Sequence, residues 1–145
     1  MKELAENGVY SVDENSRKNM ADFIGIFANE EQVFDTIKKY YDSCGYVIDT
    51  HTAVAAYANL VNRRSDSTPS VVISTASPYK FAGNVLKAAG YDTAGVDDLD
   101  MADILCSMSK VPIPDAIMQI RNAKILHDTV CSVEDMEDTV IDFLS

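Results

Sequence analysis

Three hydroxyl side chains lie at the end of a short run of β-branched apolar residues. The β-branched residues of Ser70–Thr75 predict a buried strand. Ser74, Thr75 and Ser77 then stand where open α/β sheets bind ligands, and a hydroxyl suits a neutral pyridine nitrogen because it can donate a hydrogen bond. The same hydroxyls could instead make caps and turn bonds before the helix that Pro78 opens, and the residue types alone favour this second interpretation.

A second stretch with chemical potential runs from Gly45 to Ala55 and contains Asp49 and His51. An imidazole titrates near neutrality, so His51 is a candidate acid or base. A simpler interpretation is favoured, in which Asp49 or Thr50 caps a helix and His51 orients the start of that helix or bonds a neighbouring loop. Neither residue is assigned a catalytic role.

These two stretches resemble two signatures near the end of the threonine synthase family. Val71–Phe81 is similar to the pattern apolar-Ser-Thr-Ala-His-Pro-x-Lys-Phe, with Ser77 where the family often has His. Gly45–Ala55 resembles Gly-Tyr-apolar-x-Asp/Glu-Pro-His-Thr/Ala-Ala-Val-Ala, with Thr50 in place of Pro. The tail after Gly90 is also similar to the family's ending. The resemblance implies that the chain is the C-terminal portion of a larger protein.

The resemblance implies a fold-type-II enzyme that depends on pyridoxal phosphate (PLP). Such an enzyme converts O-phosphohomoserine and water to L-threonine and phosphate, as a carbon–oxygen lyase acting on phosphates. In this family a hydroxyl near the signature turn faces the ring nitrogen of PLP. That role falls on Thr75, with Ser74 as the alternative.

Two parts that hold PLP firmly in the family have no counterpart in this sequence. The Schiff-base lysine belongs to an upstream Phe-Lys-Asp type of motif, and Lys80, which begins a helix after Pro78, does not match it. A glycine-rich phosphate loop is also missing. We therefore expect the isolated chain to be inactive and to bind no PLP covalently. Its expected partner is the N-terminal remainder of the enzyme.

The apolar spacing predicts an α/β chain that is predominantly helical, with about six helices around one or two short parallel-type strands. We expect a single C-terminal domain over 1–145, with an irregular segment at 1–10, helices over 11–64 that include a short strand near 46–48, a strand at 70–75 and a helical tail over 78–145. A lone strand leaves its backbone unpaired, so the other strands lie either at 46–48 or in the missing remainder.

Charge and composition narrow the class of protein further. The 145 residues carry a net charge of −11, which disfavours nucleic acid and anionic membranes as partners. We find no signal peptide and no apolar run of membrane-spanning length, so the expected location is the cytoplasm. Three scattered cysteines indicate reduced thiols, and no metal site is predicted. The alternative function is a free-standing acidic helical module that binds a protein or a small ligand.

Overall fold

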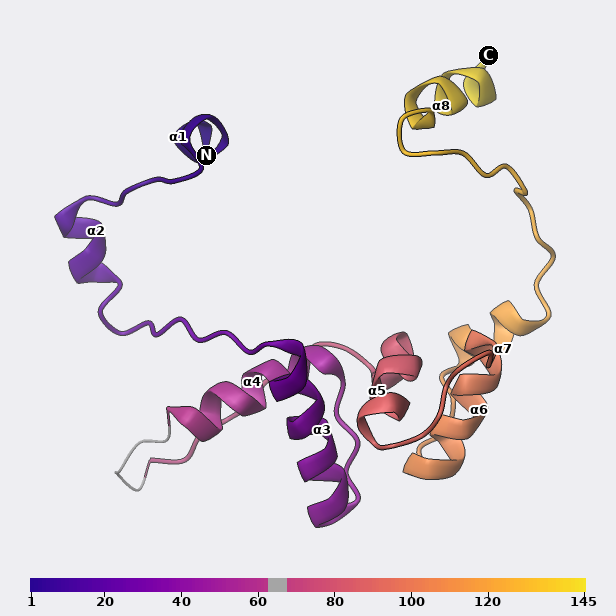
Figure 1. The fold of residues 1–145 in the computed structure, drawn as a ribbon, viewed down its shortest axis with the longest axis horizontal. Helices are drawn as coiled ribbons and strands as arrows, with labels where there is room; N and C mark the ends of the chain where they lie inside the picture. The colour runs from indigo at the N-terminus through magenta and orange to yellow at the C-terminus, as the bar shows by residue number, and fades with distance from the viewer. Residues whose placement is uncertain (63–67) are drawn as a thin grey trace.

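The computed structural model describes residues 1–62 and 68–145, and every regular element in these ranges is helical (Figure 1). The elements in chain order are α1 (Lys2–Asn7), α2 (Glu14–Asn19), α3 (Glu30–Cys44), α4 (Thr50–Val61), the 3₁₀ helix η1 (Pro78–Phe81), α5 (Ala82–Ala88), α6 (Asp98–Ser109), α7 (Asp115–Arg121) and α8 (Met136–Leu144). The prediction of a mainly helical chain is confirmed.

Local sequence signals explain where the longest helix begins and ends. The Asn29 side chain accepts a hydrogen bond from the Gln32 N–H, and the Gln32 side chain accepts one from the Asn29 N–H, each at 2.9 Å. This capping box satisfies two backbone donors that the first turn of a helix otherwise leaves unpaired. Gly45 ends α3 in the left-handed conformation (φ 69°), which costs glycine little.

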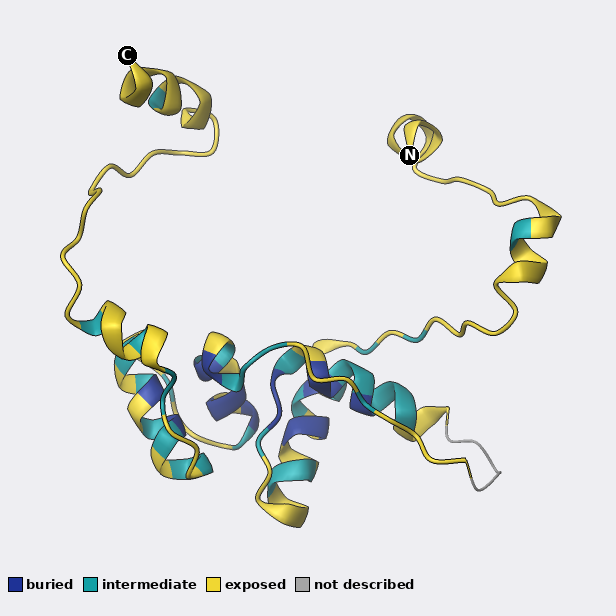
Figure 2. Ribbon diagram, turned by 180° about the vertical axis from the view of Figure 1, so that it is seen from behind, coloured by how far each residue is buried: buried dark blue, intermediate teal, exposed yellow. Residues whose placement is uncertain are grey.

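A small core holds four helices together. α3 packs against α4 and α5, and α5 packs against α6. Figure 2 shows that the buried residues gather in this part of the chain, which we call the helical body (α3 to α6). The largest apolar side chains without solvent exposure are Ile37, Val85, Leu86 and Leu105. A side-chain hydrogen bond of 2.6 Å from Gln32 to Tyr57 adds a polar link between α3 and α4.

The predicted strands at 46–48 and 70–75 are wrong for the described residues, which contain no strand. The second segment is extended, but the backbone of residues 70–76 makes no hydrogen bond within the described part of the chain. Val71 is 79% exposed and Ile73 is 68% exposed. A β-branched sequence favours extended backbone, but a strand also requires a neighbouring strand for its ladder of hydrogen bonds.

The ends of the chain differ from expectation in two further places. Residues 2–7 form α1 rather than an irregular segment, because good helix formers are followed by Gly8 in the left-handed conformation. The helical tail predicted over 78–145 is interrupted, because α7 ends at Arg121 and α8 begins only at Met136. Of the helical range predicted over 11–64, residues 63 and 64 lie outside the described residues.

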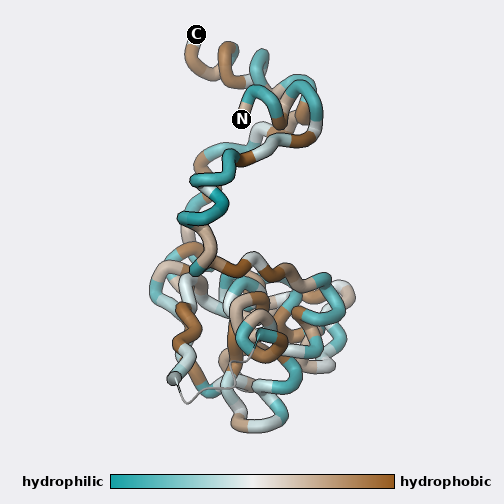
Figure 3. The backbone as a smooth tube through the Cα atoms, turned by 90° about the vertical axis from the view of Figure 1, so that its left-hand side faces the viewer, coloured by the Kyte–Doolittle hydropathy of each residue, from teal (hydrophilic) through white to brown (hydrophobic). Residues whose placement is uncertain are grey.

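Two arms leave the helical body on the same side, as Figures 1 and 3 show. The N-terminal arm carries α1 and α2, and the C-terminal arm carries α8. None of these three helices buries a residue. Several large apolar side chains on the arms are more than 70% exposed: Phe23, Phe27, Ile125, Leu126, Val130, Val133, Phe143 and Leu144. Both arms therefore offer apolar surface that the described residues leave uncovered.

The core makes a first testable prediction. Ile37→Val removes one methylene from a side chain with no solvent exposure, so the free energy of unfolding should fall by about 1 kcal/mol. Ile125→Val is the matched control, because Ile125 is 79% exposed on the C-terminal arm. Urea denaturation followed by circular dichroism measures both variants. Equal effects of the two substitutions would contradict the core described above.

Candidate functional site

The extended segment before η1 brings the three predicted hydroxyls to the edge of the helical body. Ser77 caps η1, because its Oγ accepts a hydrogen bond of 3.3 Å from the Tyr79 N–H, and Pro78 occupies the first turn. For Ser77 the interpretation as a helix cap is therefore the one that the structure supports. Its Oγ is engaged locally as the acceptor of this bond.

Ser74 is linked to the first turn of α4. Its Oγ lies 2.9 Å from the Oγ1 of Thr52, and the Thr52 hydroxyl also donates a short hydrogen bond to the Oδ2 of Asp49. Asp49 has no solvent exposure and Thr52 is 6% exposed. The three side chains thus form a hydrogen-bonded series, which we call the Asp49–Thr52–Ser74 relay, running from a buried carboxylate to the exposed extended segment.

Asp49 has enough donors to be buried as a carboxylate. It caps α4 as predicted, with its Oδ1 accepting hydrogen bonds from the backbone N–H groups of His51 (2.8 Å) and Thr52 (3.2 Å). Burying a carboxylate is costly unless hydrogen bonds replace its water. Three donors from one helical turn provide that replacement, and the positive end of α4 adds to it.

Thr75 differs from its neighbours. It is exposed, and within the described part of the chain its hydroxyl makes no hydrogen bond. Of the three hydroxyls considered in the sequence, Ser74 and Ser77 are thus occupied by bonds inside the protein. Thr75 is the one whose hydroxyl is open to a molecule outside it.

His51 and Lys80 lie close to this turn without joining the relay. The His51 ring is 4.9 Å from the Phe81 ring, centroid to centroid, and its Nδ1 lies 3.5 Å from the Oδ1 of Asp49. This position links the start of α4 to η1, as expected for a residue that orients a helix start. Lys80 is exposed. It lines a cleft of about 420 Å³ between η1, α5, α6 and α7.

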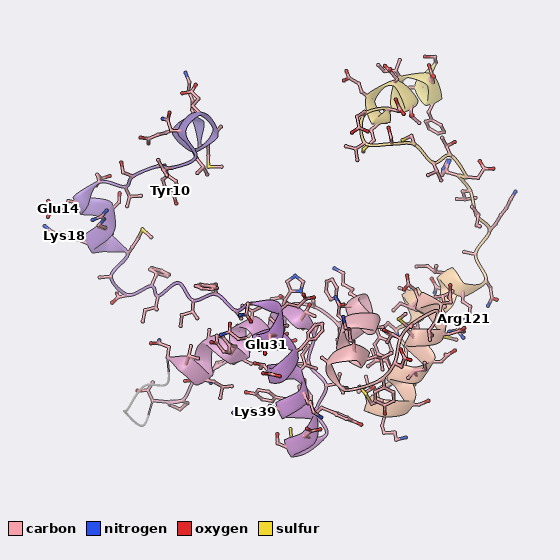
Figure 4. All side chains as sticks on the ribbon, in the orientation of Figure 1. Tyr10, Glu14, Lys18, Glu31, Lys39 and Arg121 are labelled. Carbon is pink, nitrogen blue, oxygen red and sulfur yellow. The ribbon has the colours of Figure 1, made fainter. Side chains whose placement is uncertain are left out.

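Arg121 closes the far side of the helical body, a role that sequence analysis missed. Its Nη2 donates to the Leu99 carbonyl at 2.7 Å and lies 2.9 Å from the Oδ2 of Asp103, so it ties the end of α7 to α6 (Figure 4). Thr52 was also missed as a site residue. The spacing Asp-x-x-Thr at a helix start could have revealed it, because the fourth residue of such a cap reaches back to the first.

The described residues provide neither a metal-binding cluster nor a membrane-spanning helix. No group of three or more His, Cys, Asp or Glu side chains gathers there that could hold a metal ion. Across residues 1–62 and 68–145, no helix has both the length and the apolar character needed to cross a membrane.

Comparison with known proteins identifies the family. The family model described as threonine synthase, C-terminal, matches residues 50–137, which is more than half of the chain. These residues include the relay's Thr52 and Ser74 and the exposed Thr75. The chain therefore belongs to the threonine synthase C-terminal family, as the resemblance of its two signatures predicted.

Curated relatives agree with this assignment. Threonine synthase of Pseudomonas aeruginosa is 41% identical over 66 residues, which make up 46% of this chain and 14% of that protein. Threonine synthase-like 1 of Mus musculus is 27% identical over 122 residues, 83% of this chain and 16% of that protein. The Homo sapiens protein of the same name is 35% identical over 72 residues, 49% of this chain and 9% of its own. The matches thus span a small part of each relative.

The relay predicts that Thr52 and Thr75 respond differently to the same substitution. Thr52→Val keeps the shape but removes the hydroxyl, which leaves the buried Asp49 short of one donor. The free energy of unfolding should fall by about 1–3 kcal/mol. Thr75→Val should change it by no more than about 0.5 kcal/mol, because that hydroxyl is exposed and unbonded in the described residues. Urea titrations compare the two, and similar losses would contradict the relay.

The burial of the Tyr79 phenol predicts that the protein becomes less stable at alkaline pH. Its ring is 6% exposed and its O–H donates to the Val111 carbonyl. Burial is the largest cause that raises the pKa of this phenol above its usual 10.0; contact with the Ser109 side chain opposes it, and the Cys106 thiol adds to it. A raised pKa in the folded state stabilises the protein below pH 10, and this contribution disappears as the pH rises through the folded-state pKa.

Tyr79→Phe should therefore be less stable than the wild type by about 1 kcal/mol at neutral pH, where the hydrogen bond to Val111 is lost. The difference in the free energy of unfolding between the two proteins should narrow above about pH 10, because only the wild type is destabilised by ionisation of this phenol. Urea titrations at pH 7 and about pH 10.5 test this. Tyr46→Phe, at a ring that is 63% exposed, is the control for neutral pH. A gap that widens at high pH would rule out the proposed cause.

Proposed function

We propose that this chain forms the C-terminal part of a threonine synthase, in which the Thr75 hydroxyl faces the ring nitrogen of PLP. The observation that carries the proposal is the contrast among the three hydroxyls of one turn. Ser74 bonds to Thr52, Ser77 caps η1, and Thr75 is exposed and unbonded within the described residues. Membership of the threonine synthase C-terminal family implies that the cofactor of the complete enzyme is PLP.

The chemistry of this turn fits one end of PLP. A threonine hydroxyl can donate a hydrogen bond to an unprotonated pyridine nitrogen without placing a charge beside it. When bound, PLP supplies the electron sink that elimination and replacement reactions require. In this chain Thr75 would hold the ring nitrogen, with Ser74 as the near alternative. The groups that hold the phosphate and form the Schiff base would come from the remainder of the enzyme.

The extended segment supports an N-terminal remainder as the partner. The backbone of residues 70–76 is without hydrogen bonds in the described part of the chain, and Val71 and Ile73 are largely exposed. Alternating exposed β-branched residues on open, extended backbone suit addition to the edge of a sheet. We propose that this segment becomes a strand of the sheet in the remainder and carries Thr75 to the end of that strand.

The reaction proposed for the complete protein is the conversion of O-phosphohomoserine and water to L-threonine and phosphate. The relatives that share this tail are about six to eleven times longer than their matched regions, so most of the catalytic machinery would lie outside this chain. The cytoplasmic location and the inactivity of the isolated chain stay predictions. A free-standing binding module is not favoured, because the chain belongs to the threonine synthase C-terminal family.

A hybrid enzyme tests the proposal. The Pseudomonas aeruginosa threonine synthase is truncated before its matched region and completed with the full 145-residue chain. We expect this hybrid to bind PLP and to release phosphate from O-phosphohomoserine, whereas neither the truncated enzyme nor the isolated chain should release phosphate. The intact Pseudomonas enzyme is the positive control. A hybrid that folds, binds PLP and leaves O-phosphohomoserine unchanged would overturn the proposed reaction.

The same hybrid decides which hydroxyl matters. Thr75→Val should lower kcat roughly 10- to 100-fold, which corresponds to the loss of one buried hydrogen bond, and Thr75→Ser should retain most of the activity. Ser74→Ala should have a smaller effect, because the Ser74 hydroxyl bonds to Thr52. A larger loss for Ser74→Ala than for Thr75→Val would transfer the contact to Ser74.

A further inference from the structure

The number of available protons determines which group donates and which accepts at each bond of the Asp49–Thr52–Ser74 relay. A hydroxyl has one proton, and the Thr52 hydroxyl lies within hydrogen-bond distance of both Asp49 and Ser74. A buried carboxylate can only accept, and hydrogen bonds to a charged group are the stronger ones, so the Thr52 proton goes to Asp49. The bond between Thr52 and Ser74 must then use the proton of Ser74. Ser74 therefore donates inward, and its proton is unavailable to a ligand.

This direction separates two adjacent hydroxyls that look equivalent in the sequence. Ser74 is anchored to α4 through a bond that Asp49 orients, while Thr75 follows it directly on extended backbone. Successive side chains of extended backbone point to opposite faces. Holding Ser74 toward Thr52 thus turns Thr75 away from the helical body.

The anchor is also the main polar constraint on this segment. Within the described part of the chain, the Ser74 side chain bonds this segment to Thr52 of α4, whereas the backbone of residues 70–76 makes no hydrogen bond. Asp49 and Thr52 are rigidly placed, since both are buried in the first turn of α4. A rigid element that holds one hydroxyl limits the positions that the next residue can reach.

We propose that Asp49 and Thr52 are positioning residues, which fix Ser74 as an inward donor and so present Thr75 as the hydroxyl that meets the ligand. The inference rests on the proposed function, because it treats PLP as that ligand. It adds to that function two residues that do not touch the cofactor. The alternative is that Thr52 only stabilises the start of α4 and has no influence on the turn.

The test uses the hybrid holoenzyme with three readouts: the dissociation constant of PLP followed by fluorescence, kcat and KM, and stability in urea. Thr52→Val should weaken PLP binding and lower kcat roughly 3- to 10-fold each, with KM for O-phosphohomoserine nearly unchanged. Thr52→Ser, which restores the hydroxyl, should return both values to within about twofold of the wild type. These figures correspond to the loss of about one neutral hydrogen bond.

Thr36→Val is the matched control. Thr36 is 4% exposed, and its hydroxyl donates to the Gln32 carbonyl within α3, far in sequence from the turn. This variant removes a buried threonine hydroxyl as Thr52→Val does, but PLP affinity should stay at the wild-type value. If both variants move PLP affinity equally, or if neither moves it, Thr52 is merely structural and the inference is overturned.

A double variant tests the relay itself. Ser74→Ala alone should weaken PLP binding about as much as Thr52→Val, and the double variant should be no worse than either single one, because both changes break the same bond. Multiplied effects would overturn the inference. If Thr52→Val does not fold, Ser74→Ala alone tests the inference, because it removes an exposed hydroxyl and should leave the fold intact. A PLP affinity of Ser74→Ala equal to that of the wild type would overturn the inference.

Failure of the inference and failure of the proposed function are distinguishable. An unmodified hybrid that folds but binds no PLP overturns the proposed function, and the inference fails with it. A hybrid that binds PLP and releases phosphate, but does not respond to Thr52→Val or Ser74→Ala, leaves the proposed function intact and overturns the inference alone.

Discussion

The hydrogen bonding of one buried carboxylate determines much of this structure. Asp49 has no solvent exposure, and its two oxygens are satisfied by the His51 and Thr52 backbone N–H groups and by the Thr52 hydroxyl. Without these donors, burial of the charge would be unfavourable by several kcal/mol or more, and the first turn of α4 would not pack where it does. The same bonds set the position of Thr52, which is in turn the contact of Ser74 in the extended segment.

The balance between core and exposed apolar surface explains the shape of the chain. The core joins α3, α4, α5 and α6, while the two arms and the extended segment bury few residues. Side chains such as Phe27 (85% exposed) and Val130 (94% exposed) gain nothing from the described structure. Their burial against another body would provide stabilisation proportional to the area covered. A helical body with uncovered apolar arms is what a domain separated from its larger neighbour should look like.

The sequence predicted the helices well because their signals are local. Asn29 with Gln32, Gly45 after α3, and Asp97 before α6 each act within one turn of the residues they cap. The strand at 70–75 could not be predicted as present or absent from its own residues, since its formation depends on hydrogen bonds from a second segment. The β-branched run Val71–Ile73 predicted a strand, which the described residues do not form. It carried no information about whether a neighbouring strand was present.

For the candidate site too, local patterns predicted some of the residues, whereas residues that depend on long-range contacts were missed. The resemblance selected Ser74 and Thr75, and Asp49 was recognised as a cap from its spacing. The bond of Thr52 to Asp49 follows a local cap spacing, but its second bond reaches across 22 residues to Ser74, a contact that no local pattern encodes. Arg121 was overlooked for the same reason, since its partner Leu99 also lies 22 residues away. Contacts between residues far apart in the sequence require the packing of whole helices to be known.

Within the described part of the chain the backbone of residues 70–76 is unpaired, which has a consequence for association between molecules. Exposed extended backbone flanked by Val71 and Ile73 is a template on which any other extended chain can form hydrogen bonds, including a second molecule of this protein. Two copies of the chain can therefore pair through this edge when it is left uncovered. Covering the edge would lower the tendency of the chain to aggregate.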